Sequence, residues 1–313
     1  MILRIIIRSD VAAALQQQKD LFSTRRHTMQ DPNLLKFRRY EPSEDPIRSN
    51  PNATHEERCM DPFRVGPHIW QVSGHEDFAD HLIDTGAGLV LIDTPTPDFK
   101  EELFASIAKV GYDVKDITHL FITHWHGDHD GCAAAVKEAS GCRIIMLAED
   151  WGCKCNPPRK FPMAIPFYEP DEIIWEDEVN YTIGSMTFNI TKGPGHTPGC
   201  MVIRFDDTDE EGNVYHCAMH GGLGAGQMAT EQGMWAQFIN PAMRDQFIQQ
   251  CLEMSWWDVD ITLANHMNHA GYGKALPEDR NNWKWFVDKR TWPVMLLERR
   301  GWVMEKRGEE KGR

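Results

Sequence analysis

Nine residues, THWHGDHDG at positions 123–131, constrain this chain more than any other stretch of its sequence. They place three histidines and two aspartates within seven positions, directly after the apolar run ITHLFI. Residues two apart on a strand point to the same side, so we expect His124 and His126 to project together. Asp128 and His129 would then open the following helix. Imidazole and carboxylate groups together suit zinc, with iron and manganese less favoured.

A simpler explanation of this stretch is a helix start capped by Asp128, with the histidines facing solvent. Capping accounts for one aspartate and for none of the histidines. We therefore predict a metal site at this strand-to-helix corner.

The remaining pattern predicts strands and helices in two similar halves. Apolar runs bounded by glycine favour strands, and apolar residues at helical spacing favour helices. The first half has expected strands at 68–72, 80–86, 88–94, 117–123 and 142–147, and expected helices at 98–112 and 130–141. The second half has expected strands at 171–177, 186–192, 200–206, 214–220 and 260–265, and an expected helix at 241–257.

Three parts are expected along the chain. Residues 1–60 are polar and dotted with proline, which indicates an extended N-terminal arm. Residues 61–275 carry the strand and helix signals of a catalytic domain. Residues 276–313 form a Trp-rich helical tail that is expected to pack on the domain or to support a homo-oligomer. Within the domain, 151–170 is rich in proline and aromatic residues and is expected to be a long irregular lid over the site.

Composition narrows the class of partner. The net charge of −14 argues against binding to a phosphate backbone, which favours a basic surface. No stretch approaches the ~20 apolar residues of a membrane span, and the first residues do not read as a secretory signal. The eight cysteines are too few for a disulfide scaffold in a chain of 313 residues, so reduced thiols in the cytoplasm are expected. A small-molecule substrate fits this composition better than a nucleic acid or a membrane.

Three stretches resemble the metallo-β-lactamase superfamily. HWHGDHDG at 124–131 fits its H-x-H-x-D-H signature, and GPGHTPGC at 193–200 fits its next landmark, a histidine flanked by glycines. HLIDTGAGLVLIDT at 81–94 is similar to its opening hairpin, and the resemblance covers roughly 65–275. It implies an α+β, four-layer αββα fold, with two packed mixed β-sheets flanked by helices and the metals at one edge.

The resemblance also implies a set of ligands for two zinc ions per chain, with iron or manganese as alternatives. His124, His126 and His196 would hold the first ion, and Asp128, His129 and His266 the second. His266 is preferred to His269, which is expected to lie outside the ligand set, and Asp93 is expected to orient the site more than Asp84.

One landmark departs from the common pattern of the family. Most hydrolases of the superfamily have a metal-bridging aspartate where this chain has Met219 and His220. The third subclass of metallo-β-lactamases, the most similar subgroup, also lacks a ligand there, but it has a serine pair where this chain has His220 and Gly222. His220 could support a ligand, bind metal or contact the substrate; we predict a catalytic role through substrate contact.

These features predict a dinuclear zinc hydrolase. A metal-bound hydroxide would open an amide, lactam, lactone or ester bond of a small molecule, with Asp128 orienting the hydroxide and accepting a proton. A true β-lactamase is the alternative, although the missing serine pair predicts weak β-lactam turnover. A non-catalytic metal-binding scaffold is an alternative of another class, and the full set of six ligands argues against it.

Overall fold

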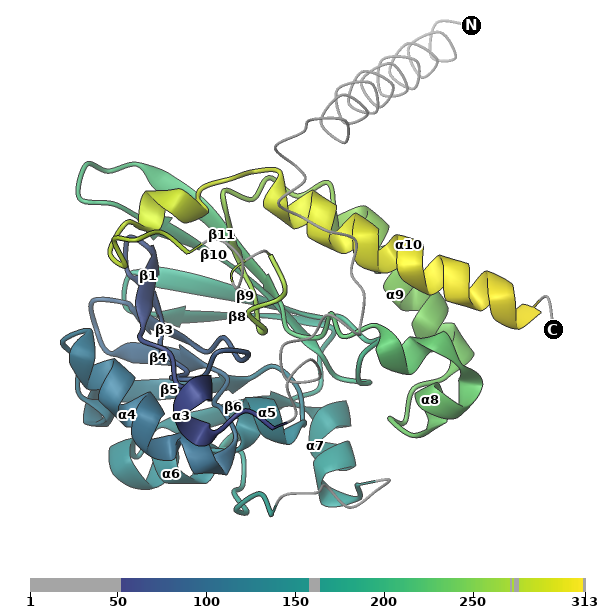
Figure 1. Ribbon diagram of the computed structural model, residues 1–313, viewed down its shortest axis with the longest axis horizontal. Helices are drawn as coiled ribbons and strands as arrows, with labels where there is room; N and C mark the ends of the chain where they lie inside the picture. The colour runs from purple at the N-terminus through teal and green to yellow at the C-terminus, as the bar shows by residue number, and fades with distance from the viewer. Residues whose placement is uncertain (1–51, 158–163, 271, 273–275, 312–313) are drawn as a thin grey trace, which may run out of the picture. The chain divides into compact units, whose positions relative to one another are not determined.

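The computed structural model describes residues 52–157, 164–270, 272 and 276–311, and shows two β-sheets packed face to face (Figure 1). Most of the expected arm, residues 1–51, lies outside the described residues. The described helices and strands belong to one compact unit, which spans residues 39–313. No helix among the described residues is both long and apolar enough to cross a membrane.

The first sheet has seven strands in the order β1-β2-β3-β4-β5-β6-β7. The pairs from β1 to β4 are antiparallel and the pairs from β4 to β7 are parallel, so the sheet is mixed. The strands are β1 (Phe63–Gly66), β2 (Ile69–Gln71), β3 (His81–Asp84), β4 (Leu89–Ile92), β5 (Ile117–Ile122), β6 (Arg143–Leu147) and β7 (Glu172–Ile174).

The second sheet has five strands in the order β12-β11-β10-β9-β8. Its strands are antiparallel except for the parallel pair β11 and β12. They are β8 (Glu178–Ile183), β9 (Met186–Lys192), β10 (Met201–Thr208), β11 (Val214–His220) and β12 (Ile261–Leu263).

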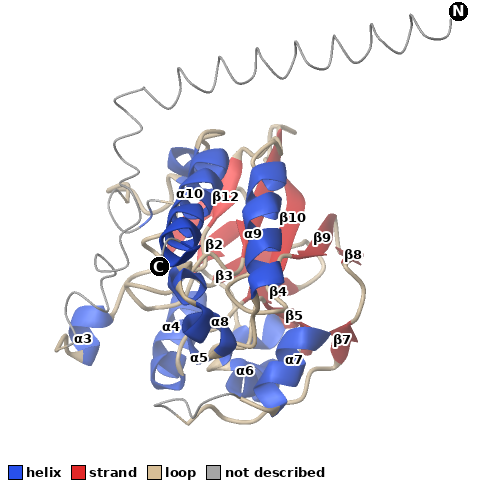
Figure 2. Ribbon diagram, turned by 90° about the vertical axis from the view of Figure 1, so that its right-hand side faces the viewer, coloured by secondary structure: helices blue, strands red, loops and turns tan. Residues whose placement is uncertain are grey.

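Helices cover the outer face of each sheet, with α4 and α6 on one side and α9 and α10 on the other (Figure 2). The α-helices are α3 (His55–Arg58), α4 (Lys100–Lys109), α5 (Gly127–Asp130), α6 (Ala133–Ser140), α7 (Ala148–Cys155), α8 (Glu231–Trp235), α9 (Pro241–Met254) and α10 (Thr291–Lys311). Short 3-10 helices are η3 (Pro97–Phe99), η4 (Val114–Asp116), η5 (Gly226–Ala229) and η7 (Trp283–Phe286).

Three separate apolar clusters show how the layers are held together. One cluster lies between the sheets and includes Ile92 and Phe188. A second joins the first sheet to α4 and α6, and a third joins the second sheet to α9 and α10. The run Leu89–Ile92 is apolar throughout because alternate side chains enter the first and second clusters. The expected four-layer αββα fold is therefore confirmed.

The Trp-rich tail packs against α9. Trp292 of α10 is fully buried, donates from Nε1 to the carbonyl of Met254 at 2.8 Å, and stacks on Trp257. At the other end of α10, Glu310 accepts from Arg244 Nη1 at 2.8 Å and from the backbone N–H of Glu231 at 2.9 Å. These contacts tie α10 to α9 and to the start of α8.

The expectation of an irregular segment over 151–170 is wrong for its first residues. Residues 151–155 belong to α7, which starts at Ala148, and 164–170 have no regular structure. Residues 158–163 lie outside the described residues.

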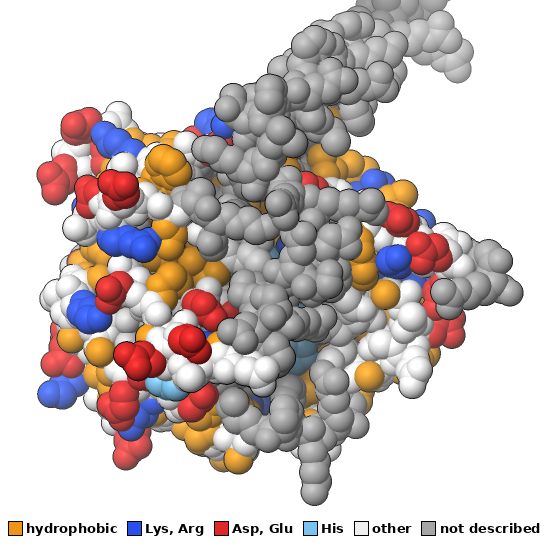
Figure 3. Space-filling model, in the orientation of Figure 1, with side chains coloured by type: hydrophobic (Ala, Val, Ile, Leu, Met, Phe, Trp, Pro, Cys, Tyr) orange, Lys and Arg blue, Asp and Glu red, His pale blue; other side chains and the backbone are white. Residues whose placement is uncertain are grey.

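Charged side chains on the face shown in Figure 3 are mixed, with single basic groups lying among acidic ones. This is the surface expected of a chain with a net charge of −14.

We predict that Trp292→Ala lowers the free energy of unfolding by about 3–5 kcal/mol, because it empties a large buried site beneath α10. Trp175→Ala is the matched control, since the Trp175 side chain is 76% exposed. Its effect should stay within about 0.5 kcal/mol. Chemical denaturation of both variants measures the difference, and equal effects would contradict the packing of α10 described here.

Candidate metal centre

The geometry of the corner after β5 differs slightly from the expectation. β5 ends at Ile122, so His124 and His126 lie in the bend between the strand and α5. Their rings still face one another, with centroids 4.8 Å apart. Asp128 and His129 belong to the single turn of α5, as expected.

His124, His126 and His196 come together into a first group of candidate ligands. His126 Nδ1 lies 3.0 Å from His196 Nε2, and His124 Nε2 is buried with no hydrogen-bond partner among the described residues. The outer nitrogens are engaged elsewhere: His196 Nδ1 with the carbonyl of Gly224 at 2.7 Å, and His126 Nε2 with Gln237 Oε1 at 2.9 Å. Each ring therefore turns one nitrogen inward, as metal-binding histidines do.

Asp128, His129 and His266 form a second group. His129 Nε2 is 3.2 Å from His266 Nε2, and Asp128 Oδ2 is 3.6 Å and 3.7 Å from those two nitrogens. The outer nitrogen of His129, Nδ1, is 3.0 Å from Asp93 Oδ2. The two groups adjoin, since the ring centroids of His124 and His129 are 4.1 Å apart.

Burial and neighbouring side chains together determine the protonation states of His124, His196 and Asp128. Burial holds the pKa of His124 well below its ordinary value, with neighbouring histidines adding to the effect, and it does the same for His196. Burial alone would raise the pKa of Asp128, but the nearby His129 and His266 outweigh it and lower that pKa. Neutral imidazoles beside an ionised carboxylate are the protonation states that metal binding requires.

Asp93 holds the end of β5 and the second group together. Its carboxylate accepts from the backbone N–H and the hydroxyl of Thr123, both at 2.7 Å, and pairs with His129. This is the orienting position expected for Asp93. Asp84 instead ends β3, where its carboxylate accepts from the Gly86 N–H and the Tyr112 hydroxyl.

A second buried carboxylate, Asp150, connects the two loops of the first group. It accepts from the backbone N–H of Trp125 at 3.0 Å, the hydroxyl of Thr197 at 2.7 Å and the N–H of Gly199 at 2.6 Å. Burial raises its pKa to about 7, against the effect of these hydrogen bonds. This role could not be predicted from the sequence, because Asp150 stands in the first turn of α7, where acidic residues are common.

The contact of Gln237 with His126 was not predicted from the sequence either. Gln237 is buried just after α8 and its side-chain oxygen holds His126, 111 residues earlier in the chain. Local spacing carries no information about such a long-range contact.

His220 lies outside both ligand groups. Its ring is 1% exposed, Nδ1 accepts from the Gly222 N–H at 3.2 Å, and Nε2 has no hydrogen-bond partner among the described residues. Burial lowers its pKa to about 4. The substrate contact expected for His220 stays a prediction. His269 is also buried and contacts Asn265 Oδ1 at 3.1 Å.

The segment after α7 reaches the candidate metal centre. Ile165 packs so close to Gly127 that a Cβ atom at Gly127 would lie 2.5 Å from the Ile165 side chain. Tyr168 donates to Asp130 at 2.9 Å, and Lys154 pairs with the same carboxylate at 2.6 Å. The glycine between His126 and Asp128 thus allows this segment to approach the site.

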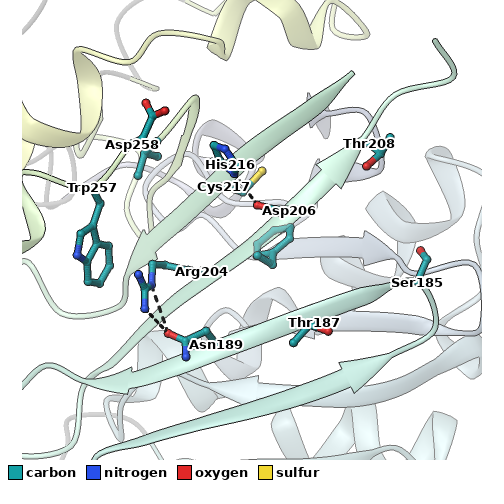
Figure 4. Close-up of a pocket in the computed structure, with 12 residues that line it drawn as sticks. Ser185, Thr187, Asn189, Arg204, Asp206, Thr208, His216, Cys217, Trp257 and Asp258 are labelled. Carbon is teal, nitrogen blue, oxygen red and sulfur yellow. Dashed lines mark hydrogen bonds and ion pairs between the residues drawn. The ribbon is translucent and has the colours of Figure 1, made fainter. Parts of the chain in front are cut away.

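A separate hollow of about 580 Å³ lies on the outer face of the second sheet (Figure 4). Arg204 donates to Asn189 Oδ1 and stacks over Trp257 at 4.0 Å, while His216 pairs with Asp206. These charged groups thus have partners, and Asp258 pairs with Lys289. None of the predicted site residues lines the hollow. The histidine groups are therefore the better candidate for a functional site.

A family match covers five of the six candidate ligands, all except His266. Residues 81–209 match the metallo-beta-lactamase superfamily. The hydroxyacylglutathione hydrolase of Cereibacter sphaeroides is 32% identical over 92 residues, which are 29% of this chain and 31% of that enzyme. The enzyme of the same name from Rhodopseudomonas palustris is 30% identical over 127 residues, 41% of this chain and 42% of its own. The chain thus matches less than half the length of these relatives.

Solved structures agree with the four-layer fold. The metallo-beta-lactamase GOB-18 of Elizabethkingia meningoseptica has a TM-score of 0.71 at 23% identity, covering 82% of this chain and 96% of that one. BJP-1, a subclass B3 metallo-beta-lactamase of Bradyrhizobium japonicum, has a TM-score of 0.68 at 20% identity, covering 81% and 96%. The layers define an αββα domain with histidine groups at one edge. The family match over residues 81–209 agrees with this fold, so the domain is similar to those of the metallo-beta-lactamase superfamily.

We predict that His124→Ala and His196→Ala each lower the metal content of the purified protein, because each removes one inward-facing nitrogen of the first group. His216→Ala is the control, since His216 lies in the separate hollow. Elemental analysis gives the metal content per chain. Full occupancy in both site variants would exclude the first group as a metal site.

Gln237 provides a test of ring orientation. We predict that Gln237→Leu weakens metal binding by ~10–100-fold, because His126 Nε2 loses its acceptor. Gln237→Glu keeps an acceptor oxygen and should retain most of the affinity. Competition with a chelator measures both, and equal losses would mean that Gln237 serves packing alone.

Proposed function

We propose that this chain is a hydrolase that works with two metal ions and opens an amide, lactam, lactone or ester bond of a small molecule. The observation that carries the proposal is the pair of adjoining ligand groups, three histidines in one and two histidines with Asp128 in the other. A degenerate binding protein would not need both groups to remain intact.

The residues fit metal ions on physical grounds. A buried ring nitrogen without a hydrogen bond, such as His124 Nε2, is costly unless another partner satisfies it. Nitrogen atoms of neighbouring imidazoles that face each other at 3.0 Å and 3.2 Å are suited to share a cation. Imidazole and carboxylate ligands favour zinc, and iron and manganese are the alternatives.

Ions bound here would lower the pKa of a water molecule and polarise the carbonyl of the substrate. Asp128 is ionised because its pKa is lowered, so it can accept a hydrogen bond from the attacking water and orient it. The same carboxylate then receives the proton of that water and passes it to the leaving nitrogen or oxygen. Asp93 and Gln237 hold the rings of His129 and His126 in place during the reaction.

The class of substrate rests on the residues at the end of β11. The strand ends in Met219 and His220, and two glycines follow, so no carboxylate or serine side chain is present at 219–222. The serine pair that the resemblance to the third subclass would supply is absent, which favours a small amide, lactone or ester over a β-lactam drug. A true β-lactamase remains the second candidate because solved enzymes of that name share the fold.

All eight cysteines are free thiols. This supports the further proposal of a cytoplasmic enzyme with a small-molecule substrate, because reduced thiols persist in that compartment.

A substrate panel tests the proposal. The zinc-loaded protein should hydrolyse at least one of a set of lactones, amides, esters, β-lactams and the thioester hydroxyacylglutathione, which two relatives carry in their names. Turnover should disappear on chelation and return with added metal. A protein that binds two ions but turns over none of these would favour the scaffold alternative.

We predict that Asp128→Asn folds normally but loses turnover by ~10²–10⁴-fold, because an amide cannot accept the proton. Asp113→Asn is the control, since this exposed aspartate only caps η4 and asparagine caps equally well. Steady-state kinetics on the panel substrate that is hydrolysed fastest measures the turnover of both variants. Unchanged turnover with both ions bound would remove Asp128 from the mechanism.

A further inference from the structure

A third group of metal-ligand side chains lies where α3 meets α4, and it shares no residue with the candidate metal centre. His55, Cys59 and Glu102 offer a nitrogen, a sulfur and an oxygen atom, all within 4.8 Å of one another. His55 Nε2 is 2.7 Å from Glu102 Oε1, and Cys59 Sγ donates to the carbonyl of His55 at 3.3 Å.

The local sequence fixes two of these side chains. Thr54 and Glu57 form a capping box, in which each side chain accepts from the other residue's backbone N–H. This defines the start of α3 although the helix is only four residues long. His55 and Cys59 are four residues apart, so they lie on the same side of this turn.

The third side chain is fixed by α4 and by a glycine. Glu102 packs against Gly74, where a Cβ atom would lie 2.6 Å from Glu102 Cβ. Gly74 has a φ of +72°, and its carbonyl accepts from the Met60 N–H at 2.9 Å. The His55 ring stacks on Phe99 with centroids 4.3 Å apart, which restrains its plane. The three ligand atoms are therefore preorganised by separate contacts.

An ion pair alone does not account for this arrangement. The His55 and Glu102 side chains are 46% and 26% exposed, and exposed pairs contribute little to stability. Such a pair also does not involve Cys59 Sγ, which lies within 4.8 Å of the other two ligand atoms.

We propose that His55, Cys59 and Glu102 form an additional binding site for a borderline-soft divalent cation such as Zn²⁺. Sulfur, imidazole nitrogen and carboxylate oxygen are the zinc ligands of proteins, and a water molecule can complete the tetrahedron. On binding, the thiol proton of Cys59 passes to solvent and a sulfur–metal bond forms. His55 Nε2 and the Glu102 carboxylate exchange their mutual hydrogen bond for bonds to the ion, with the ring proton moving to Nδ1. The bound ion links α3 to α4.

Cobalt titration of the metal-free full-length protein tests this site separately from the candidate metal centre. The two groups of that centre contain only nitrogen and oxygen ligands, so a thiolate-to-cobalt charge-transfer band in the near ultraviolet reports a cysteine ligand. We expect the wild-type protein to show this band. Cys59→Ser should abolish it and lower the bound metal by one ion per chain, whatever the substrate panel shows.

Cys155→Ser is the matched control, because Cys155 is the other exposed thiol and lies on α7. It should keep the band at full intensity. Glu102→Gln should weaken cobalt binding by more than the ~10-fold that even an outer partner costs. No band in the wild-type protein, or an equal band in Cys59→Ser, would overturn the proposal.

Discussion

The carboxylate of Asp150 is the contact on which the candidate metal centre most depends. It receives hydrogen bonds from residues beside His126 and beside His196, and so joins loops that leave different sheets. Three donors in a buried place offset the cost of removing that group from water. Asp150 thus contributes to the spacing of the first ligand group, although it would itself contact no metal.

The centre also depends on the packing between the sheets. His124 and His126 follow β5 of the first sheet, whereas His196 lies between β9 and β10 of the second. The apolar cluster between the sheets therefore fixes the distance between the ligands. Asp93 has the matching role for the second group, because it holds both Thr123 and His129. The packing between the sheets and the contacts of Asp93 therefore position the candidate ligands at the same edge.

The features predicted from the sequence are those that depend on residues close together in the chain. The cluster of histidines after an apolar strand indicated four candidate ligands, and the family resemblance implied His196 and His266. The structure brings all six together in the expected two groups. Apolar runs such as that of β4 indicated strands, and the family resemblance implied the layers. Gln237 and Asp150 were missed because their partners are distant in sequence. The helix at 151–155 was missed because Gly152 and two cysteines obscure its pattern, and packing of Cys153 and the Lys154–Asp130 pair stabilise it instead.

The contacts of Glu310 have a consequence far from α10. Glu310 accepts from the first residue of α8, and α8 leads directly to Gln237, which holds the ring of His126. A fragment limited to residues 61–275 would contain all six candidate ligands and yet lack this brace, together with the buried Trp292. Such a fragment would lose the contacts that join α10 to α8 and α9. The unit that holds the His126 ring in place is therefore larger than the segment that supplies the candidate ligands.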